Sequence, residues 1–233
     1  MSLQAEPRRD ICVIIPCYNE APAIGRIIRT AQVYVEQVIV VDDGSTDGTS
    51  AEAESSGALV IHHARNMGKG VALKTGFQIA AQRGLAAAIT LDGDGQHACA
   101  EIPLFIKAYD QGDCDLVLGN RMNDTSNMPC IRRITNRFTS WAISRTVGQT
   151  IADTQCGFRL ISLAFWQAVR LDSCRFDLES EILIKAGRSG VRLRQVQIQT
   201  IYFSVRNSNI KPLRDTLRFI HLLWRCNCQV DKR

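Results

Sequence analysis

Short apolar runs alternate along the chain with longer segments in which apolar residues recur every three or four positions. Uninterrupted apolar runs are typical of strands that are buried on both faces, and the longer spacing is typical of amphipathic helices. The runs predict strands over residues 11–16, 37–45, 57–63, 86–91 and 115–120, and the periodic segments predict helices over residues 21–34, 68–84 and 101–111. Strands that alternate with helices through short connections predict an α/β fold with a parallel sheet covered by helices.

The pattern continues beyond residue 120 with less regularity. Residues 122–133 lack periodicity and predict a loop, and an apolar stripe from Ile134 to Arg145 then predicts a helix. TQCGFRLI indicates a turn, FDLESEILIKAGRSG a helix and VRLRQVQIQTIYF a closing strand. No linker, repeat or low-complexity block divides the sequence, so we expect one domain over residues 10–207, followed by a helical appendage over residues 208–233.

Composition and charge narrow the classes of function. The 233 residues are 45% hydrophobic and 22% charged, as expected of a folded globular protein. The net charge of +5 suits anionic substrates or an anionic membrane surface, and it is too small to imply nucleic acid as a partner. Aromatic residues make up only 6%, which also argues against a surface for base stacking.

The cysteines and the apolar runs bear on location. The nine cysteines form no CxxC pair and no signal peptide opens the sequence, so we expect reduced thiols and a cytoplasmic protein. No apolar run approaches the roughly 20 residues of a membrane-spanning helix. Peripheral contact with the cytoplasmic face of a membrane is the most that the sequence predicts.

Two acidic turns follow predicted strands. In LDGDGQH, Asp92 and Asp94 are one residue apart, so their side chains point to the same side of an extended backbone. Mg²⁺ and Mn²⁺ prefer carboxylate oxygens and keep substrate phosphates in their shell, and Gln96 could add a neutral oxygen. Asp42 and Asp43 end the run VIVV, where a carboxylate can accept from a ribose or a base. Alone, Asp92 and Asp94 are more simply a solvated turn, and Asp42 and Asp43 are equally well one. Two such pairs at the ligand-binding edge of one sheet favour a nucleotide site.

The segment RNMGKG opens a predicted helix, whose first amide groups and dipole favour an anion. Lys69 could add positive charge close to a phosphate. The segment has neither the Walker A spacing nor the dinucleotide-binding GxGxxG spacing, so a nicotinamide cofactor is not expected. Capping of the helix by the glycines is the simpler alternative.

Six motifs occur in an order that is typical of one enzyme family. PCYNE, VDDGSTDGT, ARNMGKGVALKTG, LDGDGQH, GNR and DTQCGFRL resemble the large inverting family of processive and dolichol-phosphate-mannosyltransferase-like glycosyltransferases (family 2 type), and most of all its short polyprenyl-phosphate branch. The resemblance covers roughly residues 11–207. It implies a GT-A fold with a Rossmann-like, mostly parallel sheet. It also implies metal-dependent transfer, with Mg²⁺ or Mn²⁺ and no covalent intermediate, from a UDP- or GDP-linked sugar to a polyprenyl phosphate or to a lipid- or glycan-linked hydroxyl.

The resemblance assigns roles to individual residues. Asp43 corresponds to the residue that reads the nucleoside, and Arg132 or Arg133 to one of the later arginines. The residues implied for the nucleotide sugar are Pro16, Tyr18, Glu20, Asp43, Lys69, Asp92, Gly93 and Asp94; for the metal, Asp92, Asp94 and Gln96; and for the acceptor or phosphates, Arg121, Arg133 and Arg206.

The acceptor side depends on two further motifs. Asp153 in DTQCGFRL, and Glu179 and Glu181 in FDLESEI, resemble acceptor-side positions. A hydroxyl acceptor needs a carboxylate as general base, whereas a lipid phosphate is already anionic and needs only arginines to position it. We expect catalytic roles for Asp94, Asp153 and Glu179, with Glu181 as the alternative to Glu179. The simpler interpretation of Asp153 is a helix N-cap or an ion pair with Arg159.

The end of the chain departs from the polyprenyl-phosphate branch. These enzymes usually follow the late arginine with a Gly-x-Ser-Lys-like stretch, whereas Arg206 is followed by NSNIKP, and the membrane-spanning helices of longer relatives are absent. Both departures leave the acceptor open. Residues 211–226 carry an apolar stripe among arginines, which predicts a helix that lies on an anionic membrane or docks on the domain.

Two other functions share parts of this pattern. A sugar-nucleotide pyrophosphorylase uses a related α/β sheet, but it would carry a glycine-rich loop with a basic end where this chain has PCYNE. A non-catalytic nucleotide-sugar-binding module would bind the donor without transferring the sugar.

Overall fold

Alternating side chains of the first strand divide the protein interior into two apolar layers. In β1 (Arg8–Cys17), Ile11, Val13 and Ile15 contact the helices on one face of the sheet, while Cys12 and Ile14 contact those on the other. Successive side chains of a strand point to opposite faces, so a strand that is covered on both sides must be apolar throughout. This is why the strand reads as an uninterrupted apolar run.

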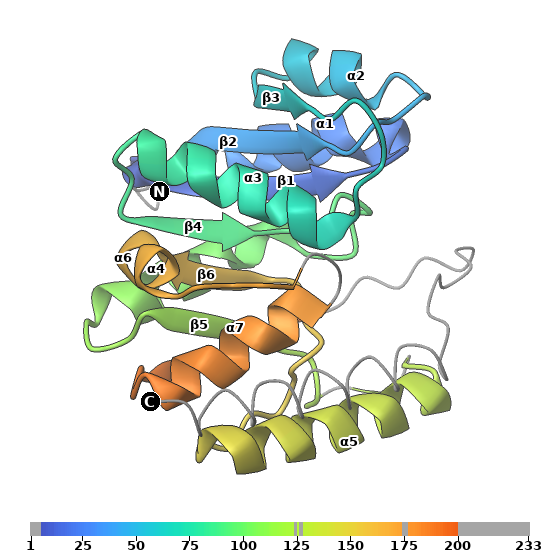
Figure 1. Cartoon of the computed structure of the whole chain (residues 1–233). Helices are drawn as coiled ribbons and strands as arrows, with labels where there is room; N and C mark the ends of the chain where they lie inside the picture. Colours follow the sequence, from blue (N-terminus) through green and yellow to red (C-terminus); the bar gives the residue numbers. More distant parts are fainter. Residues whose placement is uncertain (1–5, 124, 126–127, 174–176, 200–233) are drawn as a thin grey trace, which may run out of the picture.

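The computed structural model describes residues 6–123, 125, 128–173 and 177–199, and in them a seven-stranded sheet has the order β3-β2-β1-β4-β6-β5-β7 (Figure 1). The other strands are β2 (Val35–Asp42), β3 (Leu59–His62), β4 (Ala87–Thr90), β5 (Leu116–Asn120), β6 (Arg159–Ser162) and β7 (Leu193–Gln197). Neighbouring strands run parallel except β6, which is antiparallel to both β4 and β5. The predicted mostly parallel sheet is confirmed.

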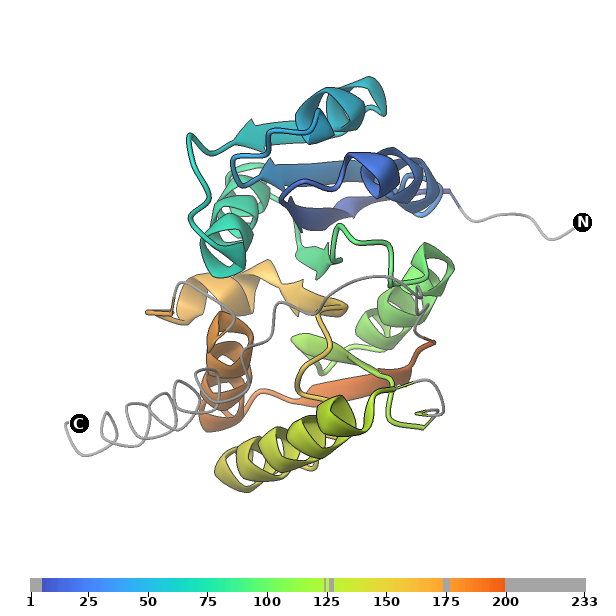
Figure 2. The same cartoon turned by 90° about the vertical axis from the view of Figure 1, so that its right-hand side faces the viewer.

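Helices cover both faces of the sheet (Figures 1 and 2). One face carries α1 (Ala21–Ala31), α2 (Thr49–Ser55), the short 3₁₀ helix η1 (Cys99–Glu101) and α4 (Ile102–Asp110); the other carries α3 (Lys69–Gln82), α5 (Cys130–Val147), α6 (Leu163–Ala168) and α7 (Asp177–Arg188). None of the helices in the described ranges is long and apolar enough to cross a bilayer.

Three elements differ from the sequence expectation, and one of them, α6, lies in a stretch for which no element was predicted. The helix α5 begins at Cys130, inside the segment predicted as a loop, and so extends the helix predicted from Ile134 by four residues at its N-terminus. The apolar stripe that predicted this helix lies on its exposed side, whereas its buried side includes the polar Asn136, Thr139 and Ser140. The strand β6 lies in the segment predicted as a turn. Four residues that pair with strands far away in the sequence carry too little local signal to be recognised. The predicted domain boundary after residue 207 and the predicted helix over residues 211–226 lie outside the described residues.

The packing of α3 on the sheet leads to a test of stability. A Cβ atom on Gly76 would collide with the buried Ile14 of β1, so Gly76→Ala should lower the free energy of unfolding by about 1–3 kcal/mol despite the better helix propensity of alanine. Gly25→Ala, in α1, is the matched control, because the added Cβ meets mainly the carboxylate end of Glu52, which can rotate away. Denaturant unfolding of both variants measures the difference, and an equal loss in the two would contradict this account of the packing.

Candidate active site

The carboxyl ends of β1, β2 and β4 lie along the edge of the sheet that Figure 2 faces. Pro16 is buried near the end of β1, and the exposed Tyr18 and the half-buried Glu20 follow it. Gly44, after β2, has φ +80°, and a Cβ on it would lie 2.8 Å from the backbone of Arg65. Because glycine alone permits this backbone and this approach, the turn after β2 touches the loop that leads into α3.

The two aspartates after VIVV hold this edge together. The backbone N–H groups of Met67 and Gly68 donate to the Asp43 carboxylate at 2.9 and 2.7 Å, and Nδ1 of His63 lies 2.7 Å from it. The Asp42 carboxylate accepts from the backbone N–H of Ser45 at 2.8 Å. Asp43 therefore fixes the backbone ahead of α3, and its predicted contact with a nucleoside stays a prediction.

The centre of the edge is an ion-pair bridge. Nζ of Lys69, the first residue of α3, lies 2.6 Å from the Asp92 carboxylate and 2.9 Å from the Glu179 carboxylate. Asp92 follows β4 and Glu179 lies in the first turn of α7, so the bridge joins three elements that are far apart in the sequence. Lys69 thus contacts two protein carboxylates, and its expected positive charge close to a substrate phosphate stays a prediction.

The ion pair shifts the pKa values of Asp92 and Lys69. Burial opposes charge on both Asp92 and Lys69, but their attraction outweighs it, so the pKa of the Asp92 carboxyl is held well below its usual range and the pKa of the Lys69 ammonium well above its own. His97, whose Nε2 lies 3.4 Å from Asp92, lowers the pKa of that carboxyl further. Asp92 and Lys69 are therefore both charged at neutral pH.

Two glycines allow the close packing around the bridge. A Cβ on Gly157, in the GFRL stretch, would lie 2.8 Å from the Asp92 carboxylate and 3.0 Å from Nζ of Lys69. A Cβ on Gly93 would lie 3.1 Å from Cβ of Cys17. Both positions need glycine because neighbouring groups occupy the space of a side chain, and Gly93 keeps the acidic turn against the end of β1.

The oxygen donors of the acidic turn suit a hard cation such as Mg²⁺ or Mn²⁺. Asp94 is half-buried, and its Oδ1 accepts only from the backbone N–H of Gln96, at 3.0 Å, among the interactions within the described residues. Asp92, in contrast, already faces Lys69. The described residues contain no preassembled group of three His, Cys, Asp or Glu side chains that could hold a metal. The residues present therefore fit a cation bound through Asp94 that takes its remaining ligands from water and from a bound diphosphate.

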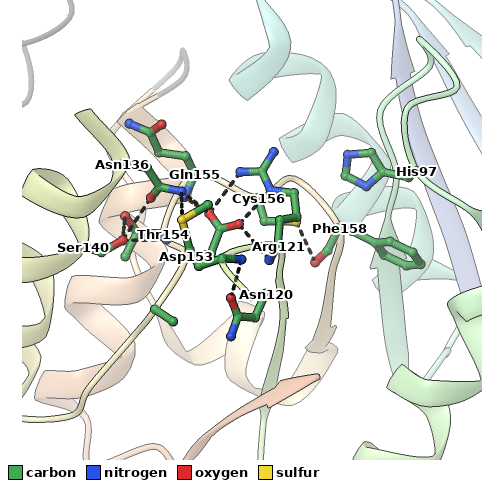
Figure 3. Close-up of polar contacts among 12 residues, drawn as sticks. His97, Asn120, Arg121, Asn136, Ser140, Asp153, Thr154, Gln155, Cys156 and Phe158 are labelled. Atoms are coloured by element: carbon green, nitrogen blue, oxygen red, sulfur yellow. Dashed lines mark hydrogen bonds and ion pairs between the residues drawn. The ribbon is translucent and has the colours of Figure 1, made fainter. Parts of the chain in front are cut away.

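A second ion pair lies beyond β5. The Asp153 carboxylate is buried and accepts from Nε of Arg121 at 2.7 Å, from Nη2 of Arg121 at 3.0 Å and from Nδ2 of Asn136 at 2.7 Å. Figure 3 shows Arg121 and Asn136 converging on Asp153, with His97 lying apart beside Phe158. Burial alone would raise the pKa of Asp153, but the hydrogen bonds and charge of Arg121 hold it below its usual range.

Arg159 fixes the loop that carries Asp153 and Gly157. It is buried and donates from Nε to the Cys156 carbonyl at 2.8 Å, from Nη2 to the Thr154 carbonyl at 2.8 Å and from Nη1 to the Glu179 carbonyl at 2.7 Å. Arg159 thus sets the loop and the start of α7 beside each other. The ion pair of Asp153 is with Arg121, not with Arg159.

The structure distinguishes the two glutamates of FDLESEI by their contacts. Glu179 faces Lys69, whereas Glu181 is buried and accepts from the backbone N–H of Ser173 at 2.7 Å and from Nζ of Lys185 at 2.8 Å. Burial opposes the charge of Glu181, but these donors lower the pKa of its carboxyl. Glu181 therefore supports the segment ahead of α7, and Glu179 belongs to the bridge.

The remaining predicted residues lie at the margin of the candidate site or outside the described residues. Gln96 is half-buried in the acidic turn, Arg133 is exposed in the first turn of α5, and Arg206 lies outside the described residues. The sequence assigned no role to His97 or Asn136. Nδ1 of His97 is buried and has no hydrogen-bond partner in the described part of the chain. The only feature of the sequence that could have drawn attention to His97 is its position directly after the DGDGQ stretch.

Two acidic turns, an anion-favouring helix start and paired arginine and lysine groups at one sheet edge match the chemistry of a nucleotide-sugar site. The model of the family described as glycosyl transferase family 2 matches residues 12–167. The chain belongs to glycosyl transferase family 2. The family favours a glycosyltransferase over both alternatives, a sugar-nucleotide pyrophosphorylase and a non-catalytic binding module.

Named relatives agree with this assignment. The chain is 31% identical over 215 residues to the UDP-N-acetylglucosamine–dolichyl-phosphate N-acetylglucosaminyltransferase of Methanococcus voltae, a match that covers 82% of the chain and 86% of the relative. It is 29% identical over 206 residues to the polyprenol monophosphomannose synthase of Mycolicibacterium smegmatis, which covers 82% and 77%. The protein is thus a glycosyltransferase, and these two relatives are named for lipid-linked acceptors.

Solved structures confirm the GT-A fold. Glucosyl-3-phosphoglycerate synthase from Mycobacterium tuberculosis in complex with UDP superposes with a TM-score of 0.72 at 22% identity, over 94% of this chain and 80% of that one. The same enzyme in complex with Mn²⁺, UDP and glucosyl-3-phosphoglycerate gives a TM-score of 0.68 at 21% identity, with the same coverage. At this identity the likeness supports the fold, and the ligands belong to that enzyme.

The buried pair of Asp153 and Arg121 predicts a large effect on stability. Asp153→Asn removes the buried carboxylate charge that Arg121 meets at 2.7 Å and should lower the free energy of unfolding by about 3 kcal/mol. Asp113→Asn is the matched control, because Asp113 pairs with Arg192 and Arg194 at the surface and should change stability far less. Denaturant unfolding at neutral pH measures both.

The same pair predicts a dependence on pH. Because the pKa of Asp153 is lower in the folded protein, its stabilisation is fully present above the carboxyl's ordinary pKa of about 4 and is lost as the pH falls through the lowered value. The stability of the unmodified protein should therefore decline more steeply in acid than that of Asp153→Asn. Parallel declines would contradict the lowered pKa.

Proposed function

We propose that this glycosyltransferase transfers a sugar, with inversion and with a divalent metal, from a UDP- or GDP-linked donor to a polyprenyl phosphate. The observation that carries the choice of acceptor is that each candidate base is paired with a cation: Asp153 with Arg121, Glu179 with Lys69 and Glu181 with Lys185. A carboxylate held in this way is a poor proton acceptor. A phosphate needs no base, because it is already an anionic nucleophile, whereas a hydroxyl does.

The donor is proposed to lie across the carboxyl ends of β1, β2 and β4. Tyr18 and Glu20 follow β1, Asp43 follows β2 and Asp92 follows β4, so these side chains surround the crevice where ligands bind in open parallel sheets. Gly93 keeps the turn of Asp92 and Asp94 close to Pro16. The relatives named for UDP-linked and lipid-linked substrates support this arrangement.

Asp94 is the proposed protein ligand of the metal, and Asp92 and Gln96 would complete its surroundings. A bound Mg²⁺ or Mn²⁺ neutralises negative charge that develops on the departing diphosphate. Lys69 keeps Asp92 ionised and holds it at a fixed position toward α7. Arg121, oriented by Asp153, supplies fixed positive charge that favours the phosphate of the donor or of the acceptor.

The inverted configuration of the transferred sugar and the location of the reaction follow from the proposed acceptor. Direct attack by the acceptor phosphate on the anomeric carbon displaces the nucleoside diphosphate in one step and inverts the configuration at that carbon. None of the paired carboxylates is available to form a covalent sugar intermediate. A lipid-linked acceptor places the reaction at a membrane face, which we propose is the cytoplasmic one because nucleotide sugars are the donors.

The test of the proposed function is a panel of UDP- and GDP-linked sugars offered with matched acceptors. We expect mass spectrometry to detect a glycosyl phosphate with a short-chain polyprenyl phosphate and no product with the corresponding polyprenol. Nuclear magnetic resonance of the product should show the anomeric configuration opposite to that of the donor. Transfer to the polyprenol instead, or retained configuration, would overturn the proposal.

The metal assignment predicts linked losses of binding. Asp94→Asn should weaken UDP or GDP binding by about tenfold to hundredfold in the presence of Mg²⁺ or Mn²⁺, because it removes the carboxylate ligand. Titration calorimetry with metal and with EDTA measures this effect, and in EDTA the variant and the unmodified protein should bind equally weakly. Asp113→Asn, at the surface near α4, is the matched control and should bind nucleotide normally. Metal-independent affinity would refute the assignment.

Substitution of the two glutamates of α7 should affect different properties, activity for Glu179 and stability for Glu181. Glu179→Gln removes one partner of Lys69 and should lower kcat by about tenfold or more while leaving the protein stable, because electrostatic order at the site is lost. Glu181→Gln replaces one of two buried acceptor oxygens with an NH2 donor and removes the charge that faces Lys185, so it should lower the free energy of unfolding by about 1–3 kcal/mol. Kinetics and unfolding of the pair measure both effects, and reversed outcomes would exchange their roles.

A further inference from the structure

His63 connects Asp43 to the helix α3 through both nitrogens of its ring. Nδ1 of His63 lies 2.7 Å from Oδ1 of Asp43, and Nε2 lies 3.0 Å from the hydroxyl oxygen of Thr75. The side chain of His63 is 10% exposed and that of Asp43 is 5% exposed, so the contact is almost closed to water. His63 directly follows β3 and Thr75 lies in the second turn of α3, so the ring ties both elements to the turn after β2.

The chemistry of the two partners fixes the direction of these hydrogen bonds. An ionised carboxylate only accepts, so Nδ1 of His63 carries a hydrogen and donates it to Asp43. The hydroxyl of Thr75 can donate or accept, so it satisfies Nε2 whether the imidazole is neutral or charged. Thr75 therefore holds the ring in the orientation in which His63 donates to Asp43.

The contacts of Asp43 leave little room for a further partner. Each oxygen of a carboxylate has about two acceptor positions. Oδ1 of Asp43 accepts from the backbone N–H of Met67 at 2.9 Å as well as from His63. Oδ2 accepts only from the backbone N–H of Gly68, at 2.7 Å, among the residues that the structure describes. Both positions of Oδ1 are thus filled, and Asp43 can take one further hydrogen bond, on Oδ2.

The single open position bears on which base the site accepts. Guanine presents two neighbouring donors, N1–H and the N2 amino group, which pair with the two oxygens of one carboxylate. Uracil presents one donor, the imide N3–H, between two carbonyl oxygens. A carboxylate with one open position matches the single donor of uracil and leaves one donor of guanine without a partner, which costs binding free energy.

We propose that His63, oriented by Thr75, is a positioning residue that closes Oδ1 of Asp43 and so selects a base with a single donor, which makes the sugar donor of this enzyme UDP-linked. The inference rests on the proposed contact between Asp43 and the nucleoside, and it narrows the proposed choice of UDP or GDP to UDP. His63 acts through Asp43 and needs no contact of its own with the nucleotide.

The choice of base is tested on the unmodified full chain by titration calorimetry with UDP, GDP and inosine diphosphate (IDP) in Mg²⁺. UDP should bind about tenfold or more tightly than GDP, because one donor of guanine is left unpaired. IDP lacks only the N2 amino group of GDP and should bind at least as tightly as GDP. GDP that binds as tightly as UDP, or about tenfold more tightly than IDP, would show that both oxygens of Asp43 read the base and would overturn the proposal.

Two substitutions of His63 separate the roles of its ring nitrogens. His63→Gln places an amide near the position of Nε2 and should weaken UDP binding by about tenfold, because Asp43 loses the donor that orients it. His63→Asn places an amide N–H near the position of Nδ1 and should recover most of this affinity. Thr75→Val removes the partner of Nε2 and should weaken UDP binding by a smaller factor than His63→Gln.

Inorganic pyrophosphate with Mg²⁺ is the control ligand, because it has no base. Its affinity should be the same in all of these variants, whereas a general disturbance of the site would weaken pyrophosphate binding together with UDP binding. In steady-state kinetics, His63→Gln should raise KM for the nucleotide sugar by a larger factor than it lowers kcat. His62→Gln is the matched control variant, because His62 is exposed and faces Glu54 at the surface, and it should bind UDP as the unmodified protein does.

Thermal melting verifies that each variant folds, and the comparison of the three nucleotides keeps the test decisive if a variant of His63 does not fold. Unchanged UDP binding by folded His63→Gln would overturn the positioning role. So would equal losses of UDP and pyrophosphate binding, or equal losses in His63→Gln and His63→Asn.

Failure of this inference and failure of the proposed function give different results. Transfer to a polyprenyl phosphate from GDP-linked sugars, without transfer from UDP-linked sugars, would leave the proposed acceptor standing and overturn this inference. Selective binding of UDP that depends on His63, without transfer to a polyprenyl phosphate, would overturn the proposed acceptor and leave this inference standing.

Discussion

One ammonium group, Nζ of Lys69, holds the candidate active site together. It contacts the carboxylates of Asp92 and Glu179, and through them it joins the start of α3, the end of β4 and the start of α7. Loss of the lysine would leave two largely buried carboxylates facing each other, which repel strongly in a site of low dielectric. The position of Glu179 at the site, the charge of Asp92 and the need for glycine at position 157 all depend on this bridge.

A second cation–carboxylate pair organises the other half of the site in the same way. Arg121 and Asp153 form an ion pair beside β5. Arg159 donates to the carbonyl of Thr154, next to Asp153, and to the carbonyl of Glu179 in α7, so it ties the Asp153 loop to that helix. Both pairs orient charge before any substrate arrives, which is how fixed groups favour an anionic transition state without reorganising. The same kind of pairing engages Asp153, Glu179 and Glu181, which is the basis of the acceptor that we propose.

The fold explains why polar groups lie inside α5 and apolar groups outside it. Asn136, Thr139 and Ser140 satisfy the buried polar loop around Asp153 and Thr154, so this side of the helix cannot be apolar. The apolar residues of the helix are left on the opposite side. A polar network at the candidate active site and an exposed apolar side are thus two consequences of one helix.

Local pattern determined most of the architecture. The strands buried on both faces, the helices with regular spacing and the acidic turns at strand ends depend on neighbouring residues, so the sequence by itself predicted the mostly parallel sheet and placed Asp42, Asp43, Asp92 and Asp94 at one edge. The choice of ion-pair partners depended on the tertiary structure. Lys69 meets Glu179, and Asp153 meets Arg121, whereas an ion pair with Arg159 was one alternative that the sequence left open for Asp153. The spatial distance between charged groups does not follow from their separation along the chain. The antiparallel β6 and the polar inner side of α5 were missed for the same reason, since each is stabilised by contacts with residues far away in the sequence.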